Sequence, residues 1–176
     1  MARNIEIKAR VTDAGRLEKC LAGLKVDFQA QLQQTDTFFK VPSGRLKLRE
    51  FADGTAELIH YHRADRSDAK LSDYERVAIS DPTGMRALLK RALGIRGTVR
   101  TQRTLLLVGK TRIHIDTVEG LGRFLELEVV LDDSDTIVAG EQTAAALLKQ
   151  LEITAGDLVS GAYIDLLETE PATVRV

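Results

Sequence analysis

Charged side chains recur at every second position on both sides of a turn between residues 112 and 130. Arg112, His114 and Asp116 alternate with isoleucines, and Glu126 and Glu128 alternate with leucine and valine. Successive strand side chains point to opposite faces, and the glycine-containing turn favours a reversal of the chain. The spacing therefore predicts a hairpin with its polar side chains on one face. Three carboxylates on that face, backed by apolar side chains, predict a bound cation.

A second set of charged side chains is basic. Arg45, Lys47 and Arg49 share one strand face while two leucines occupy the other, and Lys8 lies on the polar face of the first predicted strand. Basic and acidic side chains are thus separated by strand, whereas a solvated face more usually mixes both signs. This separation favours closure into a barrel with polar faces around a lumen and apolar faces under helices.

Hydrophobic periodicity places the elements that carry these residues. Besides the two arms of the hairpin, strands are predicted over 3–11, 31–41, 45–51, 56–63, 73–79 and 97–108, and helices over 13–24, 82–93, 141–151 and 157–168. Met85, Leu88, Leu89 and Leu93 are predicted to face inward from the second helix. The segment 64–72 has no apolar period and is predicted to be a mobile loop.

The composition indicates a soluble globular protein. Of 176 residues, 44% are hydrophobic and 29% charged, and the net charge of −1 gives no global basic surface for nucleic acid. The single cysteine, Cys20, excludes an internal disulfide framework and fits a reducing compartment. No apolar run approaches the roughly 20 residues that span a bilayer. We expect a cytoplasmic protein without a membrane or nucleic-acid partner.

Several polar residues have two interpretations from the sequence. Arg45 could bind a ligand or be a charge at the rim, and Tyr74 and Arg76 could line the lumen or face water. His114 lies on the functional face and is expected to hydrogen-bond a neighbour. The His-x-His pair at 60–62 has no third ligand nearby, so outward packing is expected rather than a metal site.

Six segments follow the order of the motifs of a known enzyme superfamily; they are 4–8, 34–39, 45–49, 112–116, 120–128 and 161–167. The chain resembles, over residues 3–168, the CYTH superfamily of triphosphate tunnel enzymes. This superfamily includes class IV adenylyl cyclases, thiamine triphosphatases and inorganic triphosphatases.

The resemblance implies an α+β fold, a closed eight-stranded antiparallel β-barrel forming a tunnel with helices packed outside. Its basic side chains would hold a triphosphate; these are Lys8, Arg45, Lys47, Arg49, Arg63, Arg103 and Arg112. Its acidic side chains would hold Mg²⁺ or Mn²⁺; these are Glu6, Asp116, Glu126 and Glu128. The residues expected to be catalytic are Glu6, Lys8, Arg49, Asp116 and Glu126. Arginine grips phosphate oxygens bidentately, and hard cations take oxygen ligands.

Three activities fit the resemblance. A class IV adenylyl cyclase would convert ATP to cyclic AMP and pyrophosphate, and an inorganic or organic (thiamine) triphosphatase would release the terminal phosphate. A non-catalytic binder of nucleotides or polyphosphate is the third. Residues 1–168 are expected to form one tunnel domain, with 169–176 a frayed tail, and a homodimer is possible.

Three positions depart from the superfamily pattern. Asn4 stands where a glutamate usually begins the opening motif, which removes one anionic metal ligand. Thr101 stands where many relatives carry a lysine, and Arg123 replaces a common acidic residue. These departures predict altered substrate choice or slow turnover.

Overall fold

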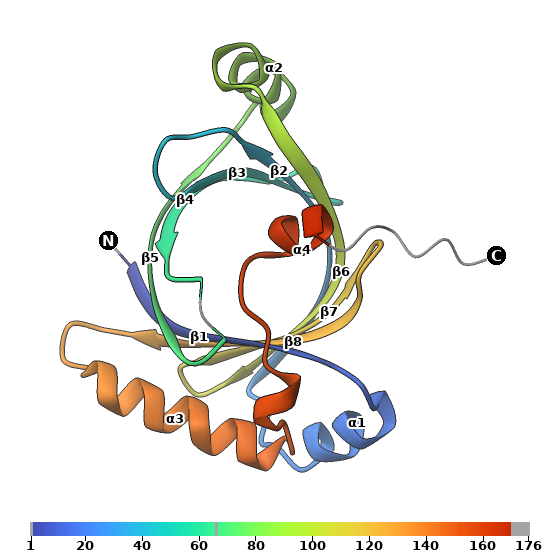
Figure 1. Cartoon of the computed structure of the whole chain (residues 1–176), viewed down its shortest axis with the longest axis vertical. Helices are drawn as coiled ribbons and strands as arrows, with labels where there is room; N and C mark the ends of the chain where they lie inside the picture. Colours follow the sequence, from blue (N-terminus) through green and yellow to red (C-terminus); the bar gives the residue numbers. More distant parts are fainter. Residues whose placement is uncertain (1, 66, 170–176) are drawn as a thin grey trace.

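Eight antiparallel strands close into a barrel in the computed structural model, which describes residues 2–65 and 67–169 (Figure 1). Around the barrel the strand order is β1-β5-β4-β3-β2-β6-β7-β8. The strands are β1 (Ala2–Arg10), β2 (Phe28–Phe39), β3 (Arg45–Phe51), β4 (Ala56–Arg63), β5 (Lys70–Ala78), β6 (Ile95–Val108), β7 (Thr111–Val118) and β8 (Gly122–Leu131). The predicted closure and the predicted hairpin, β7–β8, are confirmed.

The helices lie outside the barrel, except for the last one. They are α1 (Ala14–Ala22), α2 (Pro82–Leu93), α3 (Ile137–Gln150) and α4 (Tyr163–Thr169), with a short 3₁₀ turn, η1 (Ala155–Asp157), before α4. In Figure 1, α1 and α3 cover the side formed by β1 and β8, while α4 lies within the outline of the barrel. Within the described residues, no helix is long and apolar enough to cross a bilayer.

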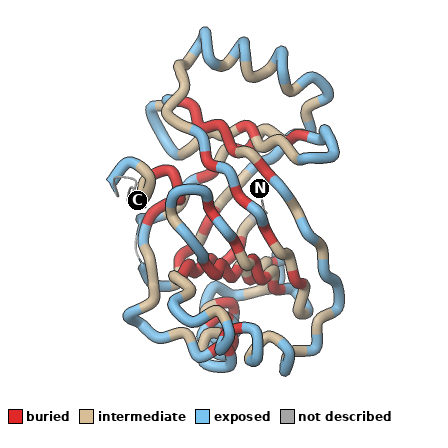
Figure 2. Tube along the Cα trace, turned by 90° about the vertical axis from the view of Figure 1, so that its right-hand side faces the viewer, coloured by how far each residue is buried: buried red, intermediate tan, exposed pale blue. Residues whose placement is uncertain are grey.

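The apolar outer faces of the strands explain why α3 packs where it does. Ile5 and Ile7 of β1 and Val129 of β8 form a buried cluster with Ala144 of α3. A Cβ at Gly140 would lie 2.7 Å from Ile5 Cγ1, so glycine permits this close approach of helix and sheet. Figure 2 shows the buried residues concentrated along the barrel, whereas α2 contributes no fully buried residue of its own.

One end of the barrel interior is filled by apolar side chains. Phe38, Val99 and Phe124 point inward there and pack with Tyr163 and Ile164 of α4. Buried apolar surface stabilises a fold by about 25 cal/mol per Å², so this cluster fixes α4 against the barrel. The polar part of the interior is therefore bounded on one side by α4.

Two predicted segments differ in kind from the structure. Residues 70–72 belong to β5 rather than to a loop over 64–72, because their backbone pairs with β1 and β4. The predicted helix over 157–168 is replaced by an extended segment and the shorter α4. There the Val159 amide donates to the Lys8 carbonyl at 2.9 Å, and Leu158 bridges to Ala9.

Leu88 is also misplaced by the sequence pattern. It is 61% exposed, whereas Met85, Leu89 and Leu93 contact the cluster under α2. These three residues follow one another at a spacing of four, so a single narrow stripe of α2 meets the barrel. The frayed tail was predicted over 169–176; Thr169 is the last residue of α4, and residues 170–176 lie outside the described residues.

Candidate functional site

The polar inner faces of the strands enclose a cavity of about 400 Å³. Seven basic and five acidic side chains line it among the described residues; they are Lys8, Lys47, Arg49, Arg63, Arg76, Arg103, Arg112, Glu6, Asp36, Glu57, Glu126 and Glu128. All eight strands contribute inward-facing residues to this wall, because alternate residues of a barrel strand point into the barrel. The structure thus brings together most of the residues selected from the sequence.

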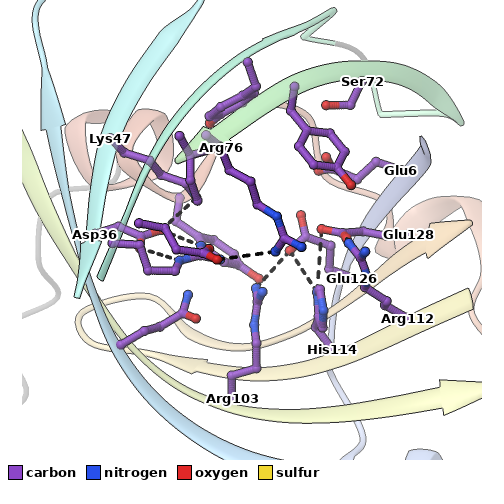
Figure 3. A pocket seen from close by; sticks show the side chains of 18 of the residues that line it. Glu6, Asp36, Lys47, Ser72, Arg76, Arg103, Arg112, His114, Glu126 and Glu128 are labelled. Carbon is purple, nitrogen blue, oxygen red and sulfur yellow. Dashed lines mark hydrogen bonds and ion pairs between the residues drawn. The ribbon is translucent and has the colours of Figure 1, made fainter. Parts of the chain in front are cut away.

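Glu126, Glu128 and His114 form a compact group on β7 and β8. One ligand atom from each lies within 4.8 Å of the others, and His114 Nδ1 is 3.7 Å from Glu126 and 3.8 Å from Glu128. Figure 3 shows the three side chains pointing toward one another in the cavity. Nδ1 of the buried His114 has no hydrogen-bond partner among the residues that the structure describes.

Neighbouring cations keep the two carboxylates of this group ionised. Burial alone would raise the pKa of Glu126, but Lys8 at 3.5 Å and Arg103 at 3.0 Å outweigh it and hold that pKa well below its usual range. Burial opposes ionisation of Glu128 as well, yet His114, Arg103 and Arg112 lower its pKa overall. Both groups therefore present negative charge to the cavity at neutral pH.

Glu6 faces the same group from β1. Burial, followed by the charge of Glu126, raises the pKa of Glu6 to about 7. Its carboxylate accepts a hydrogen bond from Arg63, which comes from β4 across the cavity. Glu6, Glu126 and Arg63 thus lie within one connected charge network, although β1 and β4 are not adjacent strands.

Asp36 organises the basic residues of β3. It accepts hydrogen bonds from Lys47 at 2.8 Å and from Nε and the terminal nitrogen of Arg49, both at 2.7 Å. Burial opposes ionisation of Asp36, but the charges of Arg49 and Lys47 lower its pKa overall. Burial and the charge of Arg49 lower the pKa of Lys47 to about 8. The sequence motif contained Asp36, but no role was predicted for it.

Asp116 supports the site from behind. Its side chain is fully buried and is not part of the cavity lining among the described residues. It accepts two hydrogen bonds from Arg103, at 2.7 and 2.6 Å, and one from the Tyr163 hydroxyl at 2.7 Å. In this arrangement the carboxylate of Asp116 orients Arg103 instead of facing a cation in the cavity.

Arg45 lies away from the cavity. Its guanidinium donates to Asp65 and to Asp165, each at 2.7 Å, and so connects the β4–β5 loop to α4. Arg96 donates to Asp165 at 2.6 Å from the other side. Of the two interpretations open from the sequence, the position of Arg45 favours a charge at the rim with a structural contact.

Two inward groups were missed by the sequence analysis. Lys70 is buried, and its pKa is lowered to about 8 by burial and by the charge of Arg63. Lys70, Ser72 and Tyr74 keep a spacing of two along β5, a signal that the predicted loop concealed. Tyr163 lines the cavity as well, and its ring lies 4.2 Å from Lys8 Nζ.

The donor set fits a divalent cation. Glu126 and Glu128 supply anionic oxygens, which Mg²⁺ and Mn²⁺ prefer, and the orphaned Nδ1 of His114 supplies a nitrogen within the same group. Asn4 also lines the cavity, and its buried Oδ1 has no partner among the described residues. The amide thus occupies the position of the missing glutamate and retains a neutral oxygen donor.

The family of the chain follows from its sequence and agrees with this geometry. The CYTH domain model matches residues 2–163, and the chain therefore belongs to the CYTH domain family. The closed barrel with its charged interior is the fold expected of the triphosphate tunnel enzymes of this family.

Individual relatives are distant but extend over almost the whole chain. The adenylate cyclase CyaB of Aeromonas hydrophila is 26% identical over 176 residues, covering 93% of this chain and 88% of that protein. The PH1012 protein of Pyrococcus horikoshii has a similar structure, with a TM-score of 0.83, 23% identity and coverage of 93% and 98%. HpAC1 from Hippeastrum, reported to have a dominant triphosphatase activity, has a TM-score of 0.66, 15% identity and coverage of 94% and 95%.

Proposed function

We propose that this protein carries out metal-dependent chemistry on a triphosphate bound inside the barrel, most closely resembling a class IV adenylyl cyclase. The observation that carries the proposal is the position of a His-Glu-Glu group beside several cations in one cavity. A site for a metal ion alone would not need so many basic side chains, whereas a triphosphate would. Six of those that line the same cavity are Lys8, Lys47, Arg49, Arg63, Arg103 and Arg112. Phosphoryl transfer needs both a metal ion and basic side chains, because both stabilise the negative charge on the phosphates.

The ion pairs of the cavity are suited to exchange with a substrate. Lys8 and Arg103 contact Glu126, and Arg112 contacts Glu128 at 3.1 Å. If Glu126 and Glu128 bind a divalent cation, these basic groups become available for phosphate oxygens. When bound, the cation would neutralise charge on the reacting phosphate and orient it. Asp36 and Asp116 would keep Arg49 and Arg103 in position throughout.

In the cyclase reaction, the ribose 3′-hydroxyl attacks the α-phosphorus and pyrophosphate leaves. We propose that Lys8, Arg49 and Arg103 stabilise the negative charge on the phosphates, and that Glu6, Glu126 and Glu128 supply the acidic wall. Asp116 would act through Arg103. The similarity to CyaB over most of both chains favours this reaction.

A triphosphatase is the second candidate. The same cavity could position water for attack on the terminal phosphorus, and the triphosphatase activity of HpAC1 supports this alternative for the fold. A protein that binds nucleotide or polyphosphate without turnover is the third, since Asn4 lowers the negative charge of the acidic wall.

Product analysis tests the proposal. The protein is incubated with ATP and with tripolyphosphate, separately with Mg²⁺ and Mn²⁺, and the products are resolved. Cyclic AMP and pyrophosphate are expected; orthophosphate release would instead support the triphosphatase. Metal-dependent thermal stabilisation by either compound without turnover would identify a binder. Absence of both turnover and stabilisation would contradict the cyclase, the inorganic triphosphatase and the binder of these two compounds.

The wider proposal includes one tunnel domain over residues 1–168 with Mg²⁺ or Mn²⁺ as cofactor. A cytoplasmic location and a homodimer belong to it as well. The single cysteine supports the cytoplasmic location, and a measurement of molecular mass in solution would test the homodimer.

A further inference from the structure

The chain segment between η1 and α4 contacts Lys8 through both its backbone and its side chain. The Val159 amide donates to the Lys8 carbonyl at 2.9 Å, and Leu158 forms a β-bridge with the next residue of β1, Ala9. Further along the segment, the Gly161 carbonyl accepts a hydrogen bond from Lys8 Nζ at 3.4 Å. The segment then leads into α4, which lies within the outline of the barrel (Figure 1). Lys8 is thus tied to the C-terminal part of the chain.

Tyr163, the first residue of α4, contributes a further contact to the Lys8 ammonium. Its ring centroid lies 4.2 Å from Lys8 Nζ, and a carboxylate oxygen of Glu126 lies 3.5 Å from the same nitrogen. The face of an aromatic ring attracts a cation, and the attraction is strongest where water is excluded. Lys8 is only 2% exposed, so this contact is shielded from water. Because the stem of a lysine is flexible, these contacts select one of many side-chain conformations.

The hydroxyl of Tyr163 reaches a second cation of the site through Asp116. It donates to Asp116 Oδ2 at 2.7 Å, and the same oxygen accepts a hydrogen bond from a terminal nitrogen of Arg103 at 2.6 Å. Burial, followed by the charge of Asp116, raises the pKa of Tyr163 well above its usual value, so the hydroxyl stays protonated and donates. One side chain therefore contacts Lys8 with its ring and the Asp116–Arg103 pair with its hydroxyl.

Apolar packing fixes the ring of Tyr163 itself. The ring centroid lies 5.0 Å from that of Phe124, and both residues belong to the buried cluster that includes Val99 and Ile164. A phenylalanine would serve this packing equally well. The hydrogen bond to a fully buried carboxylate requires the hydroxyl of a tyrosine, and the contact with Lys8 requires an aromatic ring. Tyr163 thus has two polar contacts that a role in the apolar cluster alone does not explain.

We propose that Tyr163 is a positioning residue that orients Lys8 through its ring and Arg103 through Asp116, so that both cations are aligned for a triphosphate while α4 is docked in the barrel. This inference rests on the proposed function, because it takes Lys8 and Arg103 to bind the phosphates. Cations that are already oriented need no reorganisation when a charged group arrives. The C-terminal segment thereby becomes part of the site.

The first test measures the position of Lys8 without a substrate. Protons over the face of an aromatic ring resonate upfield, so the Lys8 side-chain signals of protein with ¹³C-labelled lysine report the ring contact. Loss of these signals in Lys8→Arg assigns them. They should lie upfield in wild type and in Tyr163→Phe, which keeps the ring, and should move downfield in Tyr163→Leu. Unmoved Lys8 signals in a folded Tyr163→Leu protein would overturn the inference.

The second test asks whether Tyr163 acts on binding through Lys8. Calorimetry with Mg²⁺ measures the dissociation constant of a methylene-bridged ATP analogue, which resists cleavage. Tyr163→Leu should weaken binding roughly tenfold, because the contact that orients Lys8 is lost. The same substitution should have much less effect in a Lys8→Met background, since no ammonium remains to be oriented. An effect of equal size in both backgrounds would show a purely structural role and overturn the inference.

Two further variants guard against misfolding. Tyr163→Phe keeps the packing but removes the hydroxyl, and it should weaken the analogue roughly threefold to tenfold through the lost hydrogen bond to Asp116. Ile164→Val trims the same apolar cluster without touching Lys8, and it should leave both the Lys8 signals and the affinity unchanged. Wild-type affinity in Tyr163→Phe would overturn the connection through Asp116. Failure of the wild-type protein to bind the analogue would instead contradict the proposed function.

Discussion

Asp116 holds Arg103 through two hydrogen bonds of 2.7 and 2.6 Å, and both side chains are almost completely removed from solvent. The pair directs the guanidinium toward Glu126, which it meets at 3.0 Å. A planar guanidinium held along one edge by a carboxylate cannot rotate freely. The geometry of Arg103 is therefore fixed before any phosphate arrives.

Replacing Asp116 with Asn should destabilise the protein and misplace Arg103. Removal of one partner from a buried ion pair costs about 3–5 kcal/mol. Urea denaturation should therefore show a loss of free energy of unfolding of that order. The exposed Asp132, which pairs with Lys110 at the surface, gives a control in Asp132→Asn. Equal midpoints for wild type and Asp116→Asn would show that the buried pair contributes little.

Arg49 and Arg45 provide a matched pair on one strand face. Arg49 lines the cavity, whereas Arg45 binds Asp65 and Asp165 away from it. Arg49→Ala should raise KM for the triphosphate roughly tenfold to a hundredfold, because a charge-assisted hydrogen bond contributes about 1.5–3 kcal/mol. Arg45→Ala should leave KM close to the wild-type value. Steady-state kinetics measures both, and an equal rise in KM would return Arg45 to the binding site.

Lys47 should make triphosphate binding dependent on pH. Its pKa in the free protein is about 8, and a phosphate beside it would raise that pKa because the anion favours the charged ammonium. Affinity for the triphosphate should therefore be highest below the pKa of Lys47 in the free protein and should weaken as the pH rises above it. In the Lys47→Arg variant the side chain stays charged over this pH range, so its affinity for the triphosphate should fall much less with rising pH. Identical pH profiles of the dissociation constant in the two proteins would rule out Lys47 as the source.

Strand patterning predicted the barrel because its interior is charged while its exterior packs against helices. Alternation therefore holds along β1, β3, β7 and β8, and most of the site residues predicted on these strands line the cavity; Arg45 and Asp116 do not. Position relative to the cavity was harder to predict. Arg45 and Arg49 share a face, yet only the structure shows that Arg45 meets α4 beyond the cavity.

Contacts between distant segments account for what the sequence did not predict. The role of Asp116 depends on Tyr163, which lies 47 residues further along the chain. The extended segment before α4 depends on backbone pairing with β1, which overrides its helical apolar spacing. Lys70 was hidden because its segment has too few apolar residues to give a strand period. Each of these features is set by tertiary contacts rather than by local spacing.

We propose that Glu126 belongs to a cation site inside the triphosphate cavity. Manganese binding, followed by electron paramagnetic resonance of free Mn²⁺, tests it most directly when wild type is compared with Glu126→Gln. Glu57→Gln is the control, because Glu57 also lines the cavity but lies outside the His-Glu-Glu group. We expect wild type and Glu57→Gln to bind Mn²⁺ alike, more tightly with a non-cleavable ATP analogue, and Glu126→Gln to bind at least roughly tenfold more weakly. Wild-type Mn²⁺ affinity in a folded Glu126→Gln protein would show that Glu126 is not a ligand of the cation.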